Sequence, residues 1–256
     1  MSTIALTETP LVLYLLRRAD DALVLGHRLS EWCGHAPTME EDMAMSNIAL
    51  DLIGQARSLY QYAAERDGGT RTEDDLAYLR DAPQYRNVLL VEQPNGDFAK
   101  TMMRQFLYSA FADPYWRAMM QSSDATLAAI AAKSEKESAY HLRHASEWII
   151  RLGDGTQESA RRLANARDDL LPYVGELFEV DETERDLIAQ GVAIDPATLR
   201  ATFDETVANV FTRAKLGSGE IAWSQTGGRK GRHSEHLGHM LAEMQHLQRA
   251  YPGATW

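Results

Sequence analysis

Helical spacing of apolar residues runs through nearly the whole chain, and it constrains the fold more than any other feature. Runs that alternate Val, Ile or Thr with polar residues, which are typical of strands, are not visible, so a sheet is not expected. Thr9 and Pro10 suit a helix start, because a threonine cap commonly precedes a proline in the first turn. Four long helices are predicted at residues 10–32, 38–65, 97–121 and 124–152.

The order of these helices predicts a four-helix bundle. Two helical pairs are joined by a longer crossover, in which a short helix and an extended stretch are expected before residues 94–96. This connectivity is ferritin-like, and the alternative is an irregular all-α domain. Pro114 should kink or break the third long helix. Further helices are predicted at residues 157–171, 181–190, 196–213 and 234–250. We expect one all-α domain over residues 1–256, with the bundle at about 9–153 and a C-terminal helical extension at about 156–256.

The composition narrows the classes of partner. The chain has 256 residues and a net charge of -11, with a pI of about 5.2, so nucleic acid is not an expected partner. The short apolar run at residues 11–16 is soon interrupted by charged residues and is too brief to cross a membrane. Cys33 is the single cysteine, so neither a disulfide framework nor a cysteine-rich zinc site is expected. These features predict a cytoplasmic protein without a membrane span.

Two of the predicted bundle helices carry acidic residues where di-iron bundles carry metal ligands. Such bundles use Glu-x-x-His, with the glutamate and the histidine one helical turn apart. Here Asp51 is followed three residues later by Gly54, and Glu137 is followed by Tyr140. His141 comes one residue too late, about 100° further round the helix. Neither helix therefore has a histidine where the motif requires one.

The other two bundle helices complete a degenerate set of ligand positions. Asp20 lies at a suitable depth on the first helix, whereas Ser109, at that depth on the third, has no carboxylate. A di-iron bundle asks for four carboxylates and two histidines. We therefore expect no catalytic, cofactor-binding or metal-ligating residue, and Tyr140 is expected to fill the place of a ligand. The degenerate positions are Asp20, Asp51, Gly54, Ser109, Glu137 and Tyr140. The alternative is a di-metal oxidase that uses Asp20, Asp51, Glu137 and a displaced His141.

Three features near the C-terminus could bind a ligand or a partner. His233, His236 and His239 could form a zinc site, although a capping or interface role is favoured. The basic, glycine-rich segment Thr226–Arg232 could cradle a phosphate, including one of coenzyme A, or be a mobile loop. Trp256 either docks on the bundle or anchors a partner.

Several long segments, taken in order along the chain, resemble those of one known family. They are LGHRLSEWCGHAP, NIALDLIGQAR, NVLLVEQPNGDFA, YHLRHASEWIIRLGDGT and TGGRKGRHSEHLGHMLAEMQHLQRAYPG. Together they make the chain similar to the C subunits of phenylacetyl-CoA epoxidase complexes, which are ferritin-like proteins. The resemblance extends over nearly the whole chain.

This resemblance implies a structural role in an oxygenase. In such complexes the A subunit holds the di-iron centre and epoxidises the aromatic ring of phenylacetyl-CoA with dioxygen, and a reductase subunit supplies electrons from NADPH. The C subunit shares the fold, lacks the metal site and supports the A subunit. We therefore expect a non-catalytic subunit of phenylacetate catabolism with no cofactor of its own. Its partners would be the A subunit and other subunits in a hetero-oligomer, with a homodimer as an option when it is expressed alone.

Overall fold

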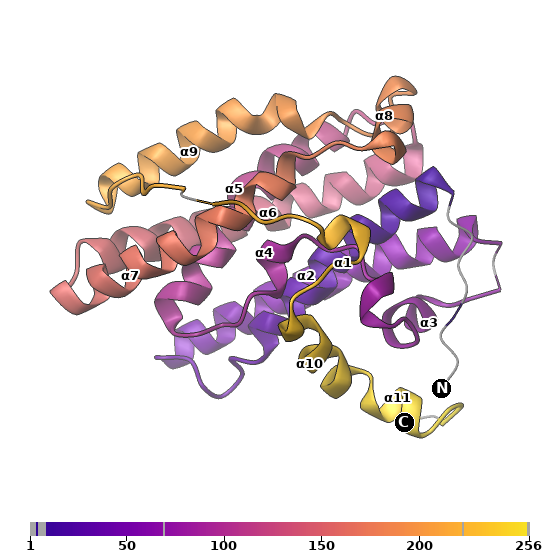
Figure 1. Ribbon diagram of the computed structural model, residues 1–256, viewed down its shortest axis with the longest axis horizontal. Coiled ribbons are helices and arrows are strands. Elements are labelled where there is room, and N and C mark those ends of the chain that lie inside the picture. Colours follow the sequence, from indigo (N-terminus) through magenta and orange to yellow (C-terminus); the bar gives the residue numbers. More distant parts are fainter. Residues whose placement is uncertain (1–3, 5–8, 69, 222, 255–256) are drawn as a thin grey trace.

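Four long helices form the body of the protein. The computed structural model describes residue 4 and residues 9–68, 70–221 and 223–254, and these contain helices and no strand (Figure 1). The long helices are α1 (Pro10–Ser30), α2 (Met39–Arg66), α5 (Phe98–Met119) and α6 (Ala125–Gly153). α1 packs extensively on α2, and α5 packs extensively on α6. The prediction of an all-α, ferritin-like bundle with additional C-terminal helices is confirmed. Trp256 lies outside the described residues.

Side-chain caps fix where the long helices begin. Thr9 accepts a hydrogen bond from the Val12 amide at 3.3 Å, with Pro10 in the first turn as the sequence predicts. Thr38 accepts one from the Glu41 amide at 3.4 Å. In the same way Asp97 caps α5 and Asp124 caps α6. Each cap satisfies an amide that the helix itself leaves unpaired, so short polar residues define the four starting points.

Helix α5 is the most deeply buried of the four, and it continues without a break through Pro114. Of the two outcomes predicted at this proline, the break is therefore wrong, and the kink stays a prediction. A proline in a helix interior costs about 3 kcal/mol, because it removes one backbone hydrogen bond and crowds the preceding turn. The neighbouring Phe111, Tyr115 and Trp116 are each at most 2% exposed, and their burial offsets that cost.

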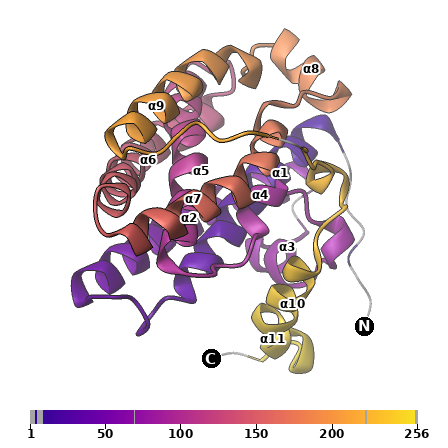
Figure 2. The same ribbon diagram turned by 60° about the vertical axis from the view of Figure 1, so that its left-hand side comes forward.

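The crossover and the C-terminal extension cover particular sides of the bundle. The extension places α7 and α9 against α5 and α6, and α8 against α1 (Figures 1 and 2). Helices α10 and α11 extend beyond the bundle on the side of α3 (Figure 1). Within the described ranges, no helix is both long and apolar enough to cross a membrane. The crossover consists of α3 (Glu73–Tyr78), η1 (Ala82–Gln84) and α4 (Leu89–Glu92). The extension consists of α7 (Gln157–Leu170), η2 (Leu171–Phe178), α8 (Glu182–Ala189), η3 (Pro196–Leu199), α9 (Arg200–Arg213), η4 (Gly228–Lys230), α10 (Glu235–Met244) and α11 (His246–Ala250).

Candidate functional site

The buried stripe of α6 contains neither Glu137 nor Tyr140, the two positions at which the sequence matched the spacing of the di-iron motif. Ser138 and His141, three residues apart, are both 2% exposed and belong to the stripe. Tyr140 is 38% exposed and stacks on His144 with ring centroids 6.1 Å apart. The prediction that Tyr140 fills the place of a buried ligand is therefore wrong. The helix presents a different pair inward, because one residue of displacement rotates a side chain by about 100°.

Helix α2 shows the same displacement by one residue. Leu52 and Gln55 are buried, whereas Asp51 lies on the flank of the helix with 37% of its side chain exposed. Gly54 is only half-buried, and a Cβ atom there would lie 3.8 Å from Nζ of Lys133. The inward pair on this helix is thus an apolar residue and an amide, which are not the carboxylate and imidazole of a di-iron motif.

Polar pairs join α2 to α6 along a line that we call the α2–α6 seam. Nε2 of His141 lies 3.0 Å from Oδ2 of Asp51. Gln55 donates from Nε2 to Oε2 of Glu137 at 2.9 Å, and Lys133 lies 3.6 Å from the same carboxylate. The third pair, with the same 2.9 Å separation, joins Nε2 of His144 to Glu41. The carboxylates of Asp51 and Glu137 therefore have partners from the facing helix, and no contact joins them to each other.

Helix α5 contributes a hydroxyl and an amide at the depth where a carboxylate was sought. Ser109 is 1% exposed, and Nε2 of Gln105 donates to its hydroxyl at 3.0 Å. The next carboxylate, Asp113, lies one turn further on and faces Arg117, with both oxygens 3.2 Å from that guanidinium. Burial raises the pKa of Asp113, although Arg117 opposes the effect. The absence of a carboxylate at Ser109 follows directly from the sequence.

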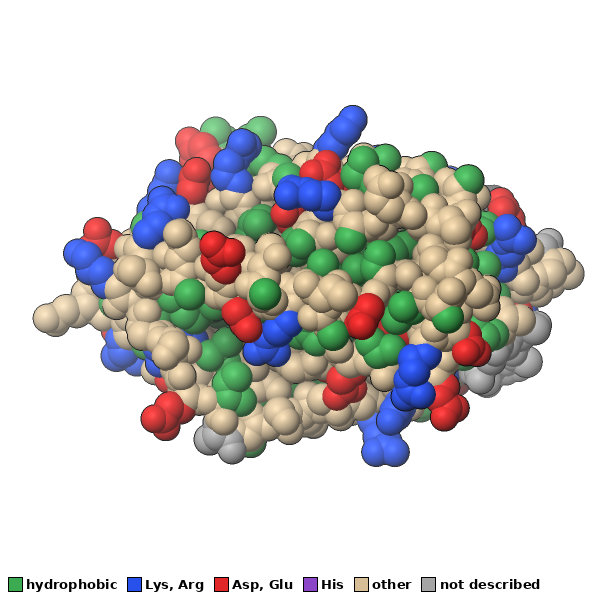
Figure 3. Space-filling model, turned by 90° about the horizontal axis from the view of Figure 1, so that it is seen from above, with side chains coloured by type: hydrophobic (Ala, Val, Ile, Leu, Met, Phe, Trp, Pro, Cys, Tyr) green, Lys and Arg blue, Asp and Glu red, His purple; other side chains and the backbone are tan. Residues whose placement is uncertain are grey.

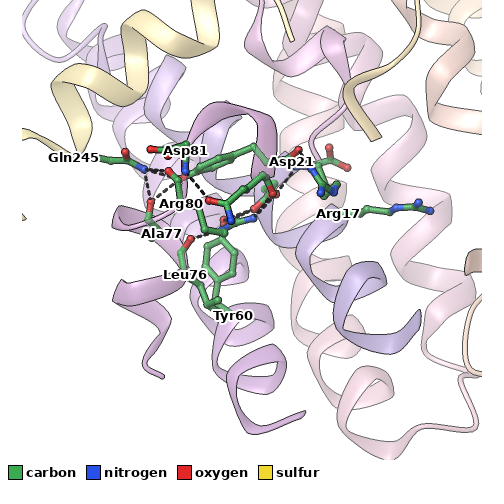
Figure 4. A network of polar contacts seen from close by, with 12 residues as sticks. Arg17, Asp21, Tyr60, Leu76, Ala77, Arg80, Asp81 and Gln245 are labelled. Carbon is green, nitrogen blue, oxygen red and sulfur yellow. Dashed lines mark hydrogen bonds and ion pairs between the residues drawn. The ribbon is translucent and has the colours of Figure 1, made fainter. Parts of the chain in front are cut away.

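Asp20 on α1 is fully buried, and a guanidinium group balances its negative charge. Arg80, which follows α3, is also fully buried and forms a two-pronged ion pair with Asp20. Figure 4 shows Arg80 beside Tyr60 within this polar network. The hydroxyl of Tyr60 donates to Asp20 at 2.5 Å, and the backbone amide of Arg86 donates at 2.7 Å. Burial alone would lower the pKa of Arg80, but the charge of Asp20 raises it above its ordinary value. Asp20 is thus occupied by protein groups on several sides.

The neighbouring Asp21 is held in the same manner. Arg229 donates to its two carboxylate oxygens at 3.0 and 2.8 Å, and the backbone amide of Val88 donates at 2.8 Å. Burial raises the pKa of Asp21, while Arg229 and Arg18 oppose that rise. Two adjacent acidic residues on α1 therefore fix two separate segments, the crossover and the glycine-rich turn, onto the bundle.

The positions selected from the sequence do not converge. Asp20 contacts the crossover, Asp51 and Glu137 contact the seam, and Ser109 lies on α5. Among the residues that the structure describes, no three His, Cys, Asp or Glu side chains are grouped so as to hold a metal ion. A di-iron centre in such a bundle needs four carboxylates and two histidines around one point. The residues present do not fit that centre.

The glycine-rich segment at residues 226–232 binds a carboxylate of the protein itself. Glu176 in η2 accepts hydrogen bonds from the amides of Gly227 at 2.9 Å and Arg229 at 3.2 Å. Its second oxygen accepts from the amide of Leu89 at 2.7 Å. The prediction that these backbone amides cradle a phosphate is therefore wrong, because Glu176 occupies them. Mobility of the segment and its contact with coenzyme A stay predictions. The turn does bind an anion through its amides, and that anion is Glu176, which is 1% exposed.

The three histidines that follow do not share a site. Nδ1 of His233 lies 2.7 Å from Glu92, and its Nε2 lies 3.0 Å from the carbonyl oxygen of Tyr85. His236 is half-buried and His239 is exposed one turn further along α10. His233 therefore joins the segment before α10 to Glu92 of α4, and the capping or interface role favoured for the three histidines stays a prediction.

Sequence reasoning missed the buried charged residues that join distant segments of the chain. Arg80, Arg229, Glu92 and Glu176 are all buried and lie far along the chain from their partners. Helical periodicity treats a charged residue as exposed by default, so it gives no signal for such pairs.

Two antiparallel helical pairs with a longer crossover place the protein in the ferritin-like class of all-α bundles, here with buried ion pairs as well as amide, hydroxyl and apolar groups in its interior. The sequence profile of the phenylacetic acid catabolic protein family matches residues 2–256. The chain is also 48% identical over 246 residues to the C subunit of 1,2-phenylacetyl-CoA epoxidase from Escherichia coli strain K12, and the match covers 96% of this chain and 99% of that protein. The chain belongs to the phenylacetic acid catabolic protein family, and the resemblance noted in its sequence is confirmed.

Proposed function

We propose that this chain is a non-catalytic structural subunit of a phenylacetyl-CoA epoxidase complex in aerobic phenylacetate catabolism. It pairs with and supports a di-iron catalytic subunit in the cytoplasm, as part of a hetero-oligomer. The similarity to a protein named as the C subunit of such an epoxidase supports the assignment to a complex. The chemistry would then take place in the partner, and this chain would supply a rigid mate for it.

A single observation carries the non-catalytic part of the proposal. The buried positions that lie closest in sequence to the di-iron motif on α2, α5 and α6 are Gln55, Ser109, Ser138 and His141, and none of them is a carboxylate. The buried carboxylates of these three helices, Glu41 and Asp113, are paired with His144 and Arg117. The buried carboxylate of α1, Asp20, is paired with Arg80. Releasing Asp20 for a metal would leave a guanidinium buried without a counter-charge, which is strongly unfavourable. The buried carboxylate of Asp20 thus stabilises the fold and is not free to bind a metal.

The alternative is a di-metal oxidase that uses Asp20, Asp51, Glu137 and His141. One observation favours it, since His141 is buried and lies 3.0 Å from Asp51. That pair could accept a metal only if Glu137 turned away from Gln55 and Asp20 left Arg80. The number of contacts that would have to break makes this the weaker proposal.

The deciding experiment measures iron and activity in the purified chain and in its complex. We expect the chain alone to contain less than stoichiometric iron after reconstitution with ferrous salt, and to form no epoxide from phenylacetyl-CoA with reductant and dioxygen. Co-expression with the catalytic subunit should give a stable complex. Stoichiometric iron together with oxygenase activity in this chain alone would contradict the proposal.

His141→Ala separates the two functions further. Under the structural role, the variant still assembles with the catalytic subunit and the activity of the complex changes little. Under the oxidase role, the same variant loses its metal. His239→Ala is the matched control, because His239 is exposed on α10 and lies far from the seam.

A further inference from the structure

The outward face of α2 carries large apolar side chains that the fold leaves in solvent. Met39 is 73% exposed, Met43 is 59% exposed and Leu50 is 66% exposed. Spacings of four and seven residues place these side chains on one stripe of the helix. Leucine and methionine together on one exposed stripe are typical of binding surfaces, since methionine adapts its shape to a partner.

The C-terminal extension does not cover this stripe. The elements that pack most on α2 are α1, α3 and α6, whereas α7, α8 and α9 lie on α1, α5 and α6. In Figures 1 and 2 the extension runs over the side of the molecule that carries α5 and α1. Figure 3 shows the molecule from the side of α9, where acidic, basic and apolar side chains are interspersed. A bundle helix of 28 residues thus keeps a free outer surface beside the seam.

Helix α6 adds a basic and aromatic stripe next to it. Lys136, Tyr140 and Arg143 are exposed and follow each other at spacings of four and three residues, so they share one face of α6. Glu147, four residues further on, is also exposed on this face and pairs with Arg151 at 3.7 Å. The guanidinium of Arg143 lies over the ring of Tyr140 at 5.5 Å. Neither Lys136 nor Arg143 forms an ion pair with another residue in the described part of the chain. This stripe and the apolar stripe of α2 border the α2–α6 seam, and together we call them the α2–α6 face.

We propose that the α2–α6 face is the surface through which this chain binds the catalytic subunit, and that it meets an acidic surface carrying apolar side chains. This inference rests on the proposed function and deepens it. The chain has a net charge of -11, yet among its described residues this face presents two cations without counter-charges. Complementary charge sets the orientation and speeds the encounter, and burial of the leucine and methionines supplies affinity.

A second copy of this chain is a poorer occupant of the same face. A two-fold dimer brings the same patch of both subunits together, so the basic stripes of both α6 helices would be buried in one interface. Like charges placed together across an interface are unfavourable. A different protein with the opposite charge avoids this, which is why the proposal commits to the catalytic subunit.

The test compares variants of the face in the full chain, each co-expressed with the catalytic subunit. Leu50→Asp should weaken binding by at least about 30-fold in titration calorimetry, the loss typical of a central interface residue. The double variant Lys136→Glu with Arg143→Glu should weaken binding at low salt, and this effect should shrink at high salt because exposed charges are screened. Since Leu50 is exposed, the melting temperature and helical circular dichroism of Leu50→Asp should match those of the wild type.

Matched controls lie on the opposite side of the molecule. Ile221→Asp changes an apolar side chain that is 54% exposed, and Arg185→Glu with Arg213→Glu reverses two exposed cations of the extension. Both controls should bind as the wild type does. Tight binding by Leu50→Asp and the charge-reversal pair would overturn the inference and leave the proposed function standing. If instead the wild type itself fails to bind, the proposed function fails. A change from dimer to monomer in Leu50→Asp alone, with catalytic-subunit binding unchanged, would assign the face to self-association and overturn the inference.

Discussion

Asp20 and Asp21 of α1 and Asp51 of the α2–α6 seam lie in the same bundle but in opposite physical settings. Asp20 and Asp21 are fully buried, and each accepts hydrogen bonds from an arginine and from a backbone amide. Asp51, on the seam, has 37% of its side chain in solvent and a single histidine as its partner. The first set connects distant segments of the chain, whereas the second set lines the edge of two helices.

This difference shows which parts of the bundle depend on ion pairs for their stability. Removing one member of a buried ion pair leaves the other charge without water or partner, which costs about 3–5 kcal/mol. Removing one member of an exposed pair costs about 0–1 kcal/mol, because water replaces the partner. We therefore expect large effects on the α1 side and small ones at the seam, and the substitutions below test that ranking.

The largest effect is expected for Arg80→Met. The substitution leaves Asp20 buried with only Tyr60 and the Arg86 amide as donors. The free energy of unfolding, measured by urea titration followed by circular dichroism, should fall by about 3–5 kcal/mol. The double variant with Asp20→Asn should recover part of that loss, because no isolated charge then remains. An equal loss in the single and double variants would show that Arg80 acts through packing and not through its charge.

Glu176→Gln should give the next largest effect. The carboxylate accepts from three backbone amides, those of Leu89, Gly227 and Arg229. An amide side chain has one acceptor oxygen in place of two, so at least one buried amide loses its partner, at a cost of about 1.5–3 kcal/mol. Exchange of the Leu89 and Gly227 amide protons, followed by NMR, should accelerate. Glu179→Gln, one turn away and not buried, serves as the control.

The sequence predicted the helices better than it predicted what joins them. Thr9, Thr38 and the long apolar periodicities located the four bundle helices to within about two residues, because caps and packing act locally. The one-residue displacement between Tyr140 and His141 was not resolved, since facing helices decide which side of α6 turns inward. The partners of Asp20, Asp21 and Glu176 were missed for a related reason. Each pair forms across a long stretch of chain, so only the folded structure brings its members together.

The free energy of unfolding should depend on pH through the imidazole of His233. Burial lowers the pKa of His233, but the hydrogen bond and charge of Glu92 and the carbonyl of Tyr85 raise it above its ordinary value. The folded state thus holds the proton more tightly than the unfolded state does. The stability contributed by His233 is present below its unfolded pKa of about 6.5 and is lost as the pH rises through the raised folded value.

We therefore expect the free energy of unfolding to fall as the pH rises above about 6.5, by at most about 1.5–3 kcal/mol, the contribution of one hydrogen bond to a charged group. His233→Gln should reduce this slope, measured by urea titration at several pH values. His239→Gln should leave it unchanged, because His239 is exposed on α10. An unchanged slope in His233→Gln would mean that another group holds the proton.

The smallest effect is expected at the seam, for Asp51→Asn. The asparagine keeps an oxygen that can face Nε2 of His141, and the position is open to water, so the stability should change by less than about 1 kcal/mol. This result would sharpen the contrast with Arg80→Met. Asp51→Asn removes the charge of one degenerate ligand position, and Arg80→Met removes the charge that pairs with another, Asp20. A loss as large as that of Arg80→Met would show that the seam is sealed from water in solution. In that case Asp51 and His141 would form a further buried charge pair, and the contrast between the α1 side and the seam would disappear.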